Sequence, residues 1–136
     1  NLGYTPRVAL LSFSNFGSLS RPSSENLKQA VEILNDRKVD FEFDGEMTPE
    51  VALDYDLIKE NYPFCRLSGP ANVLIMPSLL AANISFKLLQ KIGNGSILGP
   101  LMIGGEKPFQ IVQMGSSVSD IVNSASISAY NALYTS

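Results

Sequence analysis

The sequence contains no histidine, and it contains only one cysteine among its 136 residues. The absence of histidine excludes an imidazole base, a serine–histidine pair and a histidine-based zinc site. The single cysteine, Cys65, excludes an intrachain disulfide and offers no metal cluster. Because no histidine is available to activate its thiol, we assign Cys65 no catalytic role.

Positive charge and long apolar runs are also scarce. The formal net charge is −3 and lysine and arginine do not cluster, which argues against nucleic acid and anionic membranes as partners. No apolar run approaches the roughly 18 residues that span a bilayer. A signal peptide is not evident and the first residue is not methionine, so we expect a cytoplasmic protein of which this chain is an excised piece.

The stretch from Gly69 to Lys91 gives the clearest structural signal in the sequence. Asn72–Met76 is a short apolar run that predicts a strand buried on both faces. Pro77 cannot continue a strand, and Ser78 is a good N-cap. The apolar residues that follow keep a helical spacing, which predicts a helix from residue 79 to residue 92.

One stripe of this predicted helix is polar and carries Asn83, Lys87, Gln90 and Lys91. In parallel α/β sheets, ligands collect outside the carboxyl ends of the strands. The Met76–Ser78 turn lies at such an end, so we expect a binding site near it. The two lysines could meet a phosphate, although most such lysines only solvate a helix.

Strand patterns alternate with helical patterns along the chain, which predicts a three-layer α/β/α fold with a mostly parallel sheet. Asp44-Gly45 is a turn signal that ends one of the strands. A capping-box variant, Ser117-x-x-Asp120, opens the clearest helix, which begins at Val118. The other expected strands are residues 7–13, 39–43, 96–103 and 109–112, and the other expected helices are one capped by Ser23 or Ser24 and one from Pro49 to about Glu60.

Three groups of polar residues could carry chemistry. The loop from Met114 to Ser117 precedes a helix, where free backbone N–H groups can hold an anion, although a plain helix cap is the commoner outcome. Asp120 could act as a general base, but a capping role is favoured. Asp44 and Glu46 could bind a metal or serve as acid and base, but a turn is the commoner explanation and no third ligand is apparent. The residues alone therefore indicate an α/β ligand-binding domain.

Four segments of the sequence form a recognisable set: they are Val8–Ser14 with Gly17 and Ser18, Asp44–Met47, Ala71–Leu88, and Gly99–Pro100 with Lys107–Pro108 and Ser117–Val122. In this order they resemble the C-terminal half of the phosphotransacetylases, the phosphate acetyl/butyryl transferase family. The resemblance implies a phosphotransacetylase/isocitrate-dehydrogenase-like fold, with a cleft between two domains that binds coenzyme A and an acyl phosphate. It also implies that residues 1–112 form most of the second domain, and that residues 113–136 form a tail helix belonging to the first.

The sequence departs from this family at one position that matters for catalysis. Active phosphotransacetylases have a Ser-Arg-Gly run before the last helix, and its arginine contacts the substrate phosphate. The matching positions here are Gln113-Met114-Gly115, and a thioether cannot clamp a phosphate or stabilise its charge. Residues 12–18, with Asn15-Phe16 before the glycine, are similar to the C-terminal domain of large bacterial hybrid malic enzymes. That domain resembles a phosphotransacetylase, is regarded as lacking transferase activity, and lets acetyl-CoA inhibit the malic enzyme domain.

The resemblance therefore implies a non-catalytic regulatory domain of a malic enzyme, with acetyl-CoA as its allosteric effector. No catalytic residue is expected, and Asp120, which matches the family's proposed base toward the coenzyme A thiol, would serve only in an active transferase. No metal is expected in this chain; NADP or NAD and a divalent metal would belong to the missing domain. The parent is expected to be a homodimer through this domain. The expected ligand contacts are Asn83, Lys87, Ser116, Ser117 and Asp120.

Two alternatives remain open. The first is an active phosphate acetyl/butyryltransferase that moves an acyl group between an acyl phosphate and coenzyme A. Its phosphate-binding arginine would come from another position, and the candidates are Arg7, Arg21, Arg37 and Arg66. The second is a structural dimerisation domain whose contact would use Phe41, Phe43 and the apolar loop Tyr62–Phe64.

Overall fold

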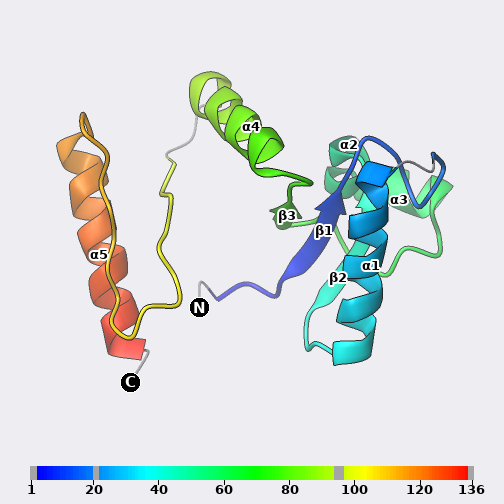
Figure 1. Ribbon diagram of the computed structural model, residues 1–136, viewed down its shortest axis with the longest axis horizontal. Coiled ribbons are helices and arrows are strands. Elements are labelled where there is room, and N and C mark those ends of the chain that lie inside the picture. Colours follow the sequence, from blue (N-terminus) through cyan, green and yellow to red (C-terminus); the bar gives the residue numbers. More distant parts are fainter. Residues whose placement is uncertain (1–2, 20–21, 94–96, 135–136) are drawn as a thin grey trace. The chain divides into compact units, whose positions relative to one another are not determined.

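The structure is a computed structural model of the chain and describes residues 3–19, 22–93 and 97–134 (Figure 1). The chain divides into two compact units, residues 1–87 and residues 88–136. The division falls within the helix α4 (Leu79–Ile92), and each unit is described by itself.

The first unit is built on a parallel sheet of three strands (Figure 1). β1 (Arg7–Leu11) lies in the centre, between β2 (Glu42–Met47) and β3 (Val73–Ile75). The last four residues of β1 are all buried, as expected for a central strand that is covered on both faces. The predicted α/β fold with a parallel sheet is confirmed.

Helices connect the strands and cover both faces of the sheet. α1 (Pro22–Arg37) links β1 to β2, whereas α2 (Pro49–Leu53) and α3 (Tyr55–Asn61) link β2 to β3. The two connections run in opposite directions across the sheet, so right-handed crossovers place their helices on opposite faces. Figure 1 shows α1 on one side of the strands and α2 with α3 on the other. The result is the predicted arrangement of three layers.

A single cluster of buried apolar side chains holds the first unit together. Leu11 of β1 and Met47 of β2 contribute from the sheet, and Ile58 contributes from α3. Each is at most 2% exposed, and burial of such a side chain contributes about 1.5–3 kcal/mol to folding. The other members of the cluster are Ala9, Val51, Ala52, Leu67 and Ala71.

The prediction that Asp44-Gly45 ends a strand as a turn is wrong. β2 passes through both residues and pairs with β1 as far as Met47, with a shift in register between Leu10 and Leu11. The glycine allows β2 to lie close to β1, because a Cβ at Gly45 would be 2.7 Å from the backbone oxygen of Leu10. Glycine at this position therefore allows the backbones of the two strands to approach each other.

Two helix boundaries also differ from the prediction. α1 begins at Pro22, so Ser23 and Ser24 stand inside its first turn and do not precede it. The single helix expected from Pro49 to about Glu60 is divided into α2 and α3. Asp54 separates them, and its side chain caps α3 by accepting hydrogen bonds from the backbone N–H groups of Asp56 (3.1 Å) and Leu57 (3.0 Å).

The predicted helix after the last strand is confirmed, but the predicted burial of that strand is wrong. β3 stands at the edge of the sheet, where Val73 and Ile75 are 37% and 45% exposed. α4 is capped as expected, since Ser78 Oγ accepts a hydrogen bond from the backbone N–H of Ala81 (3.2 Å). No side chain of α4 is buried.

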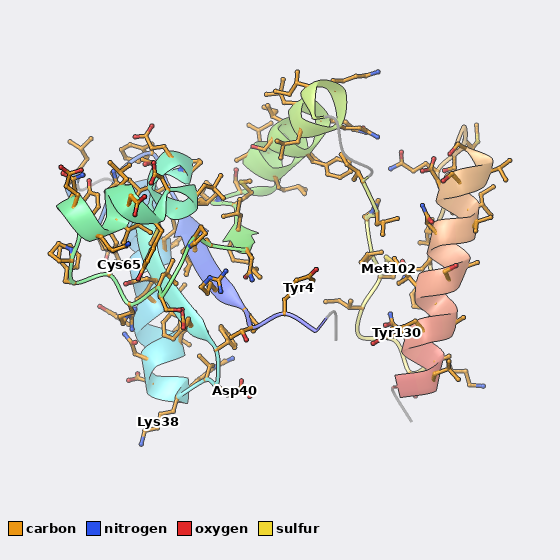
Figure 2. The ribbon with its side chains drawn as sticks, turned by 180° about the vertical axis from the view of Figure 1, so that it is seen from behind. Tyr4, Lys38, Asp40, Cys65, Met102 and Tyr130 are labelled. Carbon is orange, nitrogen blue, oxygen red and sulfur yellow. The ribbon has the colours of Figure 1, made fainter. Side chains whose placement is uncertain are left out.

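The second unit contains one helix of its own, α5 (Val118–Tyr134), preceded by an extended segment. The predicted strands 96–103 and 109–112 are wrong, because residues 97–117 contain no strand; residue 96 lies outside the described residues. Figure 1 shows the extended segment running beside α5. The Gln110 side chain joins two parts of this segment: its Oε1 accepts from the backbone N–H of Met102 (3.0 Å), a residue labelled in Figure 2.

Candidate functional site

The predicted site at the start of α5 is a compact cap. The backbone N–H and the hydroxyl of Ser117 donate to Asp120 Oδ2 over 2.9 and 2.8 Å. The backbone N–H of Asp120 donates back to Ser117 Oγ over 3.2 Å. The reciprocal pattern is a capping box with aspartate in place of glutamate, as the sequence predicts.

The electrostatics of this cap follow from the same contacts. The hydroxyl and then the backbone N–H of Ser117 lower the pKa of Asp120 below its ordinary value, because both donate to the ionised carboxylate. Asp120 and Ser117 are exposed and Ser116 is half-buried. A ligand could therefore reach all three residues, although the contacts present are those of a helix cap.

Asn83 and Lys87 lie one helical turn apart on α4, and both are exposed. The ammonium of Lys87 lies 5.6 Å from the ring centroid of Phe86, its neighbour on the same helix. These two residues belong to the first unit, whereas Ser116, Ser117 and Asp120 belong to the second. The structure therefore forms two local groups of predicted contacts, one on α4 and one at the start of α5.

Met114 stands where the resemblance implies a phosphate-binding arginine in an active transferase. It lies in a turn before α5, and its side chain is fully exposed. The backbone N–H of Ser116 donates to the carbonyl of Gln113 and closes this turn over 3.0 Å. The turn thus presents a neutral thioether to solvent.

Two of the four arginines that could replace this missing charge already have partners. Arg66 Nη2 donates to Asp44 Oδ1 over 3.1 Å, and Arg7 Nε donates to the carbonyl of Pro70 over 2.8 Å. Arg7 also begins β1, at the end of the sheet opposite to the carboxyl ends of the strands. Arg37 is exposed at the end of α1, and Arg21 lies outside the described residues.

The acids Asp44 and Glu46 are buried within β2, and this arrangement was not predicted from the sequence. Asp44 also accepts hydrogen bonds from the backbone N–H groups of Gly45 (2.9 Å) and Arg66 (2.8 Å). Glu46 accepts a hydrogen bond from the Ser14 hydroxyl over 2.6 Å. In the described part of the chain, no three histidine, cysteine, aspartate or glutamate side chains are grouped as they would be around a metal ion.

The aromatic residues suggested as a dimer contact differ in how far they are exposed. Phe43 is buried, and the Arg66 guanidinium carbon lies 4.6 Å from the centroid of its ring. Phe64 is 64% exposed and packs edge-on against Phe16, with the ring centroids 4.9 Å apart. Phe43 is therefore part of the folded unit, and Phe64 is the exposed aromatic ring of the loop.

Cys65, labelled in Figure 2, lies beside this aromatic loop. Burial raises the pKa of its thiol, because the apolar surroundings disfavour the charged thiolate. Only the thiolate is a good nucleophile, so the surroundings of Cys65 oppose reactivity.

A family model described as phosphate acetyl/butaryl transferase matches residues 1–129. The chain belongs to this family. The match includes both groups of predicted contacts and the turn that holds Met114. The family assignment given by the four sequence segments is confirmed.

The chain is similar to two classes of protein. It is 53% identical to an NADP-dependent malic enzyme of Rhizobium meliloti over 131 residues, which cover 96% of this chain and 17% of that protein. It is 38% identical to a phosphate acetyltransferase of Treponema pallidum over 129 residues, which cover 93% of this chain and 38% of that protein. Of these two relatives, the malic enzyme is clearly the more similar.

The fold agrees with these relationships. A phosphotransacetylase from Streptococcus pyogenes superposes with a TM-score of 0.87 at 32% sequence identity, covering 96% of this chain and 40% of that one. The chain thus spans less than half of the length of these relatives. It resembles the phosphotransacetylase-like domain of the malic enzymes. Among the described residues, no helix is long and apolar enough to cross a membrane.

Proposed function

We propose that this chain is the C-terminal regulatory domain of a cytoplasmic, homodimeric NADP-dependent malic enzyme and that it binds acetyl-CoA as an inhibitor. The parent protein would oxidise and decarboxylate malate to pyruvate in a domain outside this chain, using NADP and a divalent metal. This domain would bind the effector and shift the conformational equilibrium of the catalytic domain. It would not transfer acyl groups.

The observation that carries the proposal is the exposed Met114 in the turn before α5. An acyl phosphate needs cationic donors where negative charge develops during transfer, and a thioether supplies none. Arg66 does not replace the missing charge, because it neutralises Asp44. The higher identity to a malic enzyme than to a phosphate acetyltransferase supports the same conclusion.

We propose that each of the two groups of polar residues described above, taken by itself, offers contacts to the effector. Lys87 would pair with a phosphate of coenzyme A and Asn83 would donate from the same helix face. Ser116 would supply a hydroxyl donor at the start of α5, where the helix dipole favours negative charge. Asp120 accepts both donors of Ser117, so this pair would fix the shape of the turn that carries Ser116.

The first test is a coupled assay for acetyl phosphate formation from acetyl-CoA and phosphate by the full-length protein. No turnover above background is expected, while acetyl-CoA inhibits malate oxidation by the same preparation. Robust turnover would reject the regulatory proposal in favour of an active transferase. Calorimetric silence with acetyl-CoA would instead favour a structural dimerisation domain.

The second test compares two aspartates that both cap helices in this chain. Asp120→Ala in the full-length protein should weaken inhibition by acetyl-CoA, because the turn that carries Ser116 loses the bonds that hold its shape. Asp54→Ala removes the cap of α3, and it should lower stability without changing inhibition. If both variants lose stability and leave inhibition intact, Asp120 is only a cap.

A further inference from the structure

Three acidic side chains alternate along β2, and they are Glu42, Asp44 and Glu46. The first two have several hydrogen-bond donors. Glu42 accepts from the backbone N–H and the hydroxyl of Ser68, over 2.9 and 2.7 Å. Asp44 accepts from two backbone N–H groups and from the guanidinium of Arg66, which also carries the opposite charge. The fold can therefore hold both of these acids as carboxylates.

Glu46 is the most deeply buried of the three, since only 1% of the residue is exposed. Its Oε1 lies 2.6 Å from the Ser14 hydroxyl. Its Oε2 has less than 1 Å² of accessible surface and, in the described part of the chain, no hydrogen-bond partner. Neither solvent nor a ligand can reach this oxygen while the fold is intact. A carboxylate at residue 46 would therefore keep half of its charge on an atom that has no donor.

The charged side chains beside Glu46 do not compensate for this burial. Those that line the same hollow are Lys28 and Glu32, both from α1. Across the described residues, no cation forms an ion pair with Glu46. The Nζ of Lys28 instead lies 3.5 Å from the position that a Cβ would take at Gly17. Glu32 carries the same sign of charge as a carboxylate at residue 46 and would only disfavour it.

The loop after β1, residues 12–18, is fastened to the end of β2 around this carboxyl group. The backbone N–H of Ser12 donates to the carbonyl of Met47 over 2.9 Å, and the backbone N–H of Phe16 donates to the carbonyl of Glu46 over 2.7 Å. Ser14 stands between these two contacts in the sequence and is 3% exposed. Water could therefore reach a charge on Glu46 only if the loop moved away from β2.

A charge is rarely retained in such surroundings. Buried ionisable groups that lack both a counter-ion and sufficient donors give up their charge instead. The contact with Ser14 suits an uncharged carboxyl as well, because a hydroxyl can either donate or accept a hydrogen bond. We propose that the fold holds Glu46 as an uncharged carboxylic acid, and that loss of its proton as the pH rises releases the loop after β1.

The test is amide hydrogen exchange of residues 12–18 in the full-length protein, measured between about pH 5 and pH 8 and corrected for the intrinsic exchange rate. An accessible glutamate is ionised in this range, so opening of the loop should release one proton. The opening equilibrium of the wild-type loop should then increase by about tenfold per pH unit. Glu46→Gln has no proton to release and should abolish this dependence. A dependence that is absent from the wild-type protein, or that persists in Glu46→Gln, would overturn the proposal.

Glu42→Gln is the matched control on the same strand. The backbone N–H and then the hydroxyl of Ser68 hold the pKa of Glu42 below its ordinary value. Glu42 is therefore ionised whether the loop is closed or open, and its replacement should leave the tenfold dependence unchanged. Loss of the dependence in this variant would assign the released proton to another group and reject the proposal.

Infrared spectroscopy of the full-length protein gives a second readout that does not require a folded variant. An uncharged carboxyl absorbs at a higher frequency than a carboxylate, so the wild-type protein should show a carboxylic acid band at neutral pH. The band should be missing from Glu46→Gln and present in Glu42→Gln. Its absence from the wild-type protein would mean that Glu46 is ionised, which rejects the proposal even if Glu46→Gln fails to fold.

Discussion

The two units of the chain differ in how far their apolar side chains are buried. In the first unit, Leu11, Met47 and Ile58 are almost completely removed from solvent. In the second unit, no described residue is buried, and Ile103 and Leu133 are 89% and 75% exposed. The first unit thus supplies its own core, whereas the second leaves its large apolar side chains exposed, as interaction surfaces do.

The largest expected difference between the units comes from truncating one apolar side chain in each. In the 136-residue chain, Met47→Ala should lower the free energy of unfolding by about 2–5 kcal/mol, because it leaves a cavity in the core. Leu133→Ala should change it by no more than about 0.5 kcal/mol. Urea unfolding followed by circular dichroism measures both values.

The same two substitutions, made in the full-length protein, test this comparison further. Leu133→Ala should become clearly more destabilising there, if the apolar surface of the second unit is covered in the complete protein. Equal effects of the two substitutions in the isolated chain would show that the contrast between the units is wrong.

A smaller effect is expected at the ion pair of the first unit that joins the buried Asp44 to the partly exposed Arg66. Arg66→Gln leaves Asp44 buried without its cation and should cost about 1–3 kcal/mol of stability. Arg37→Gln is the matched control, because Arg37 is exposed at the end of α1. Thermal unfolding of the two variants should differ by several degrees, and identical midpoints would mean that solvent already screens the Asp44 pair.

The smallest expected effect compares two carboxylates, the half-buried Glu42 of the first unit and the exposed Asp120 of the second. Serine donors lower both pKa values, but the backbone N–H of Ser68 is the larger cause for Glu42, whereas the hydroxyl of Ser117 is the larger cause for Asp120. Replacing each serine by alanine removes only the hydroxyl. The pKa of Asp120 should therefore rise further in Ser117→Ala than the pKa of Glu42 rises in Ser68→Ala, as measured by NMR titration of the carboxyl carbons.

The sign of the resulting pH dependence follows from these lowered pKa values. Each carboxylate stabilises the fold above the pKa that it has in the unfolded chain. That contribution is lost as the pH falls through the lower pKa of the folded state. Helix content at the start of α5 should accordingly fall in acid below the ordinary aspartate range, and Ser117→Ala should remove part of this dependence. A profile that does not change in the variant would contradict the capping geometry.

The elements that the sequence predicts well are those with local signals. Pro77 and Ser78 separate β3 from α4, and the spacing between Ser117 and Asp120 suffices to predict their mutual hydrogen bonds. Such signals require no knowledge of distant parts of the chain. The family resemblance depends on spacing over the whole chain, and it too was available from the sequence.

The features that the sequence does not predict depend on distant partners. Asp44-Gly45 is a strong turn signal. The aspartate is nevertheless buried within a strand, where Arg66, 22 residues away in the sequence, donates hydrogen bonds to it. Residues 97–112 have the composition of strands. A strand forms only where it can hydrogen-bond to another strand, so composition alone does not predict one here. The free oxygen of Glu46 has no local signature, because it results from how α1 and the loop after β1 pack. The proposed division at residue 112 stays a prediction.

Met114 also bears on the evolutionary history of the domain. Its thioether packs against no described neighbour, so the architecture would accept a guanidinium at that position without rearrangement. A methionine codon, ATG, becomes the arginine codon AGG by a single base change. A single base change would therefore place a cation in this turn, and the exposed position offers no steric barrier to it.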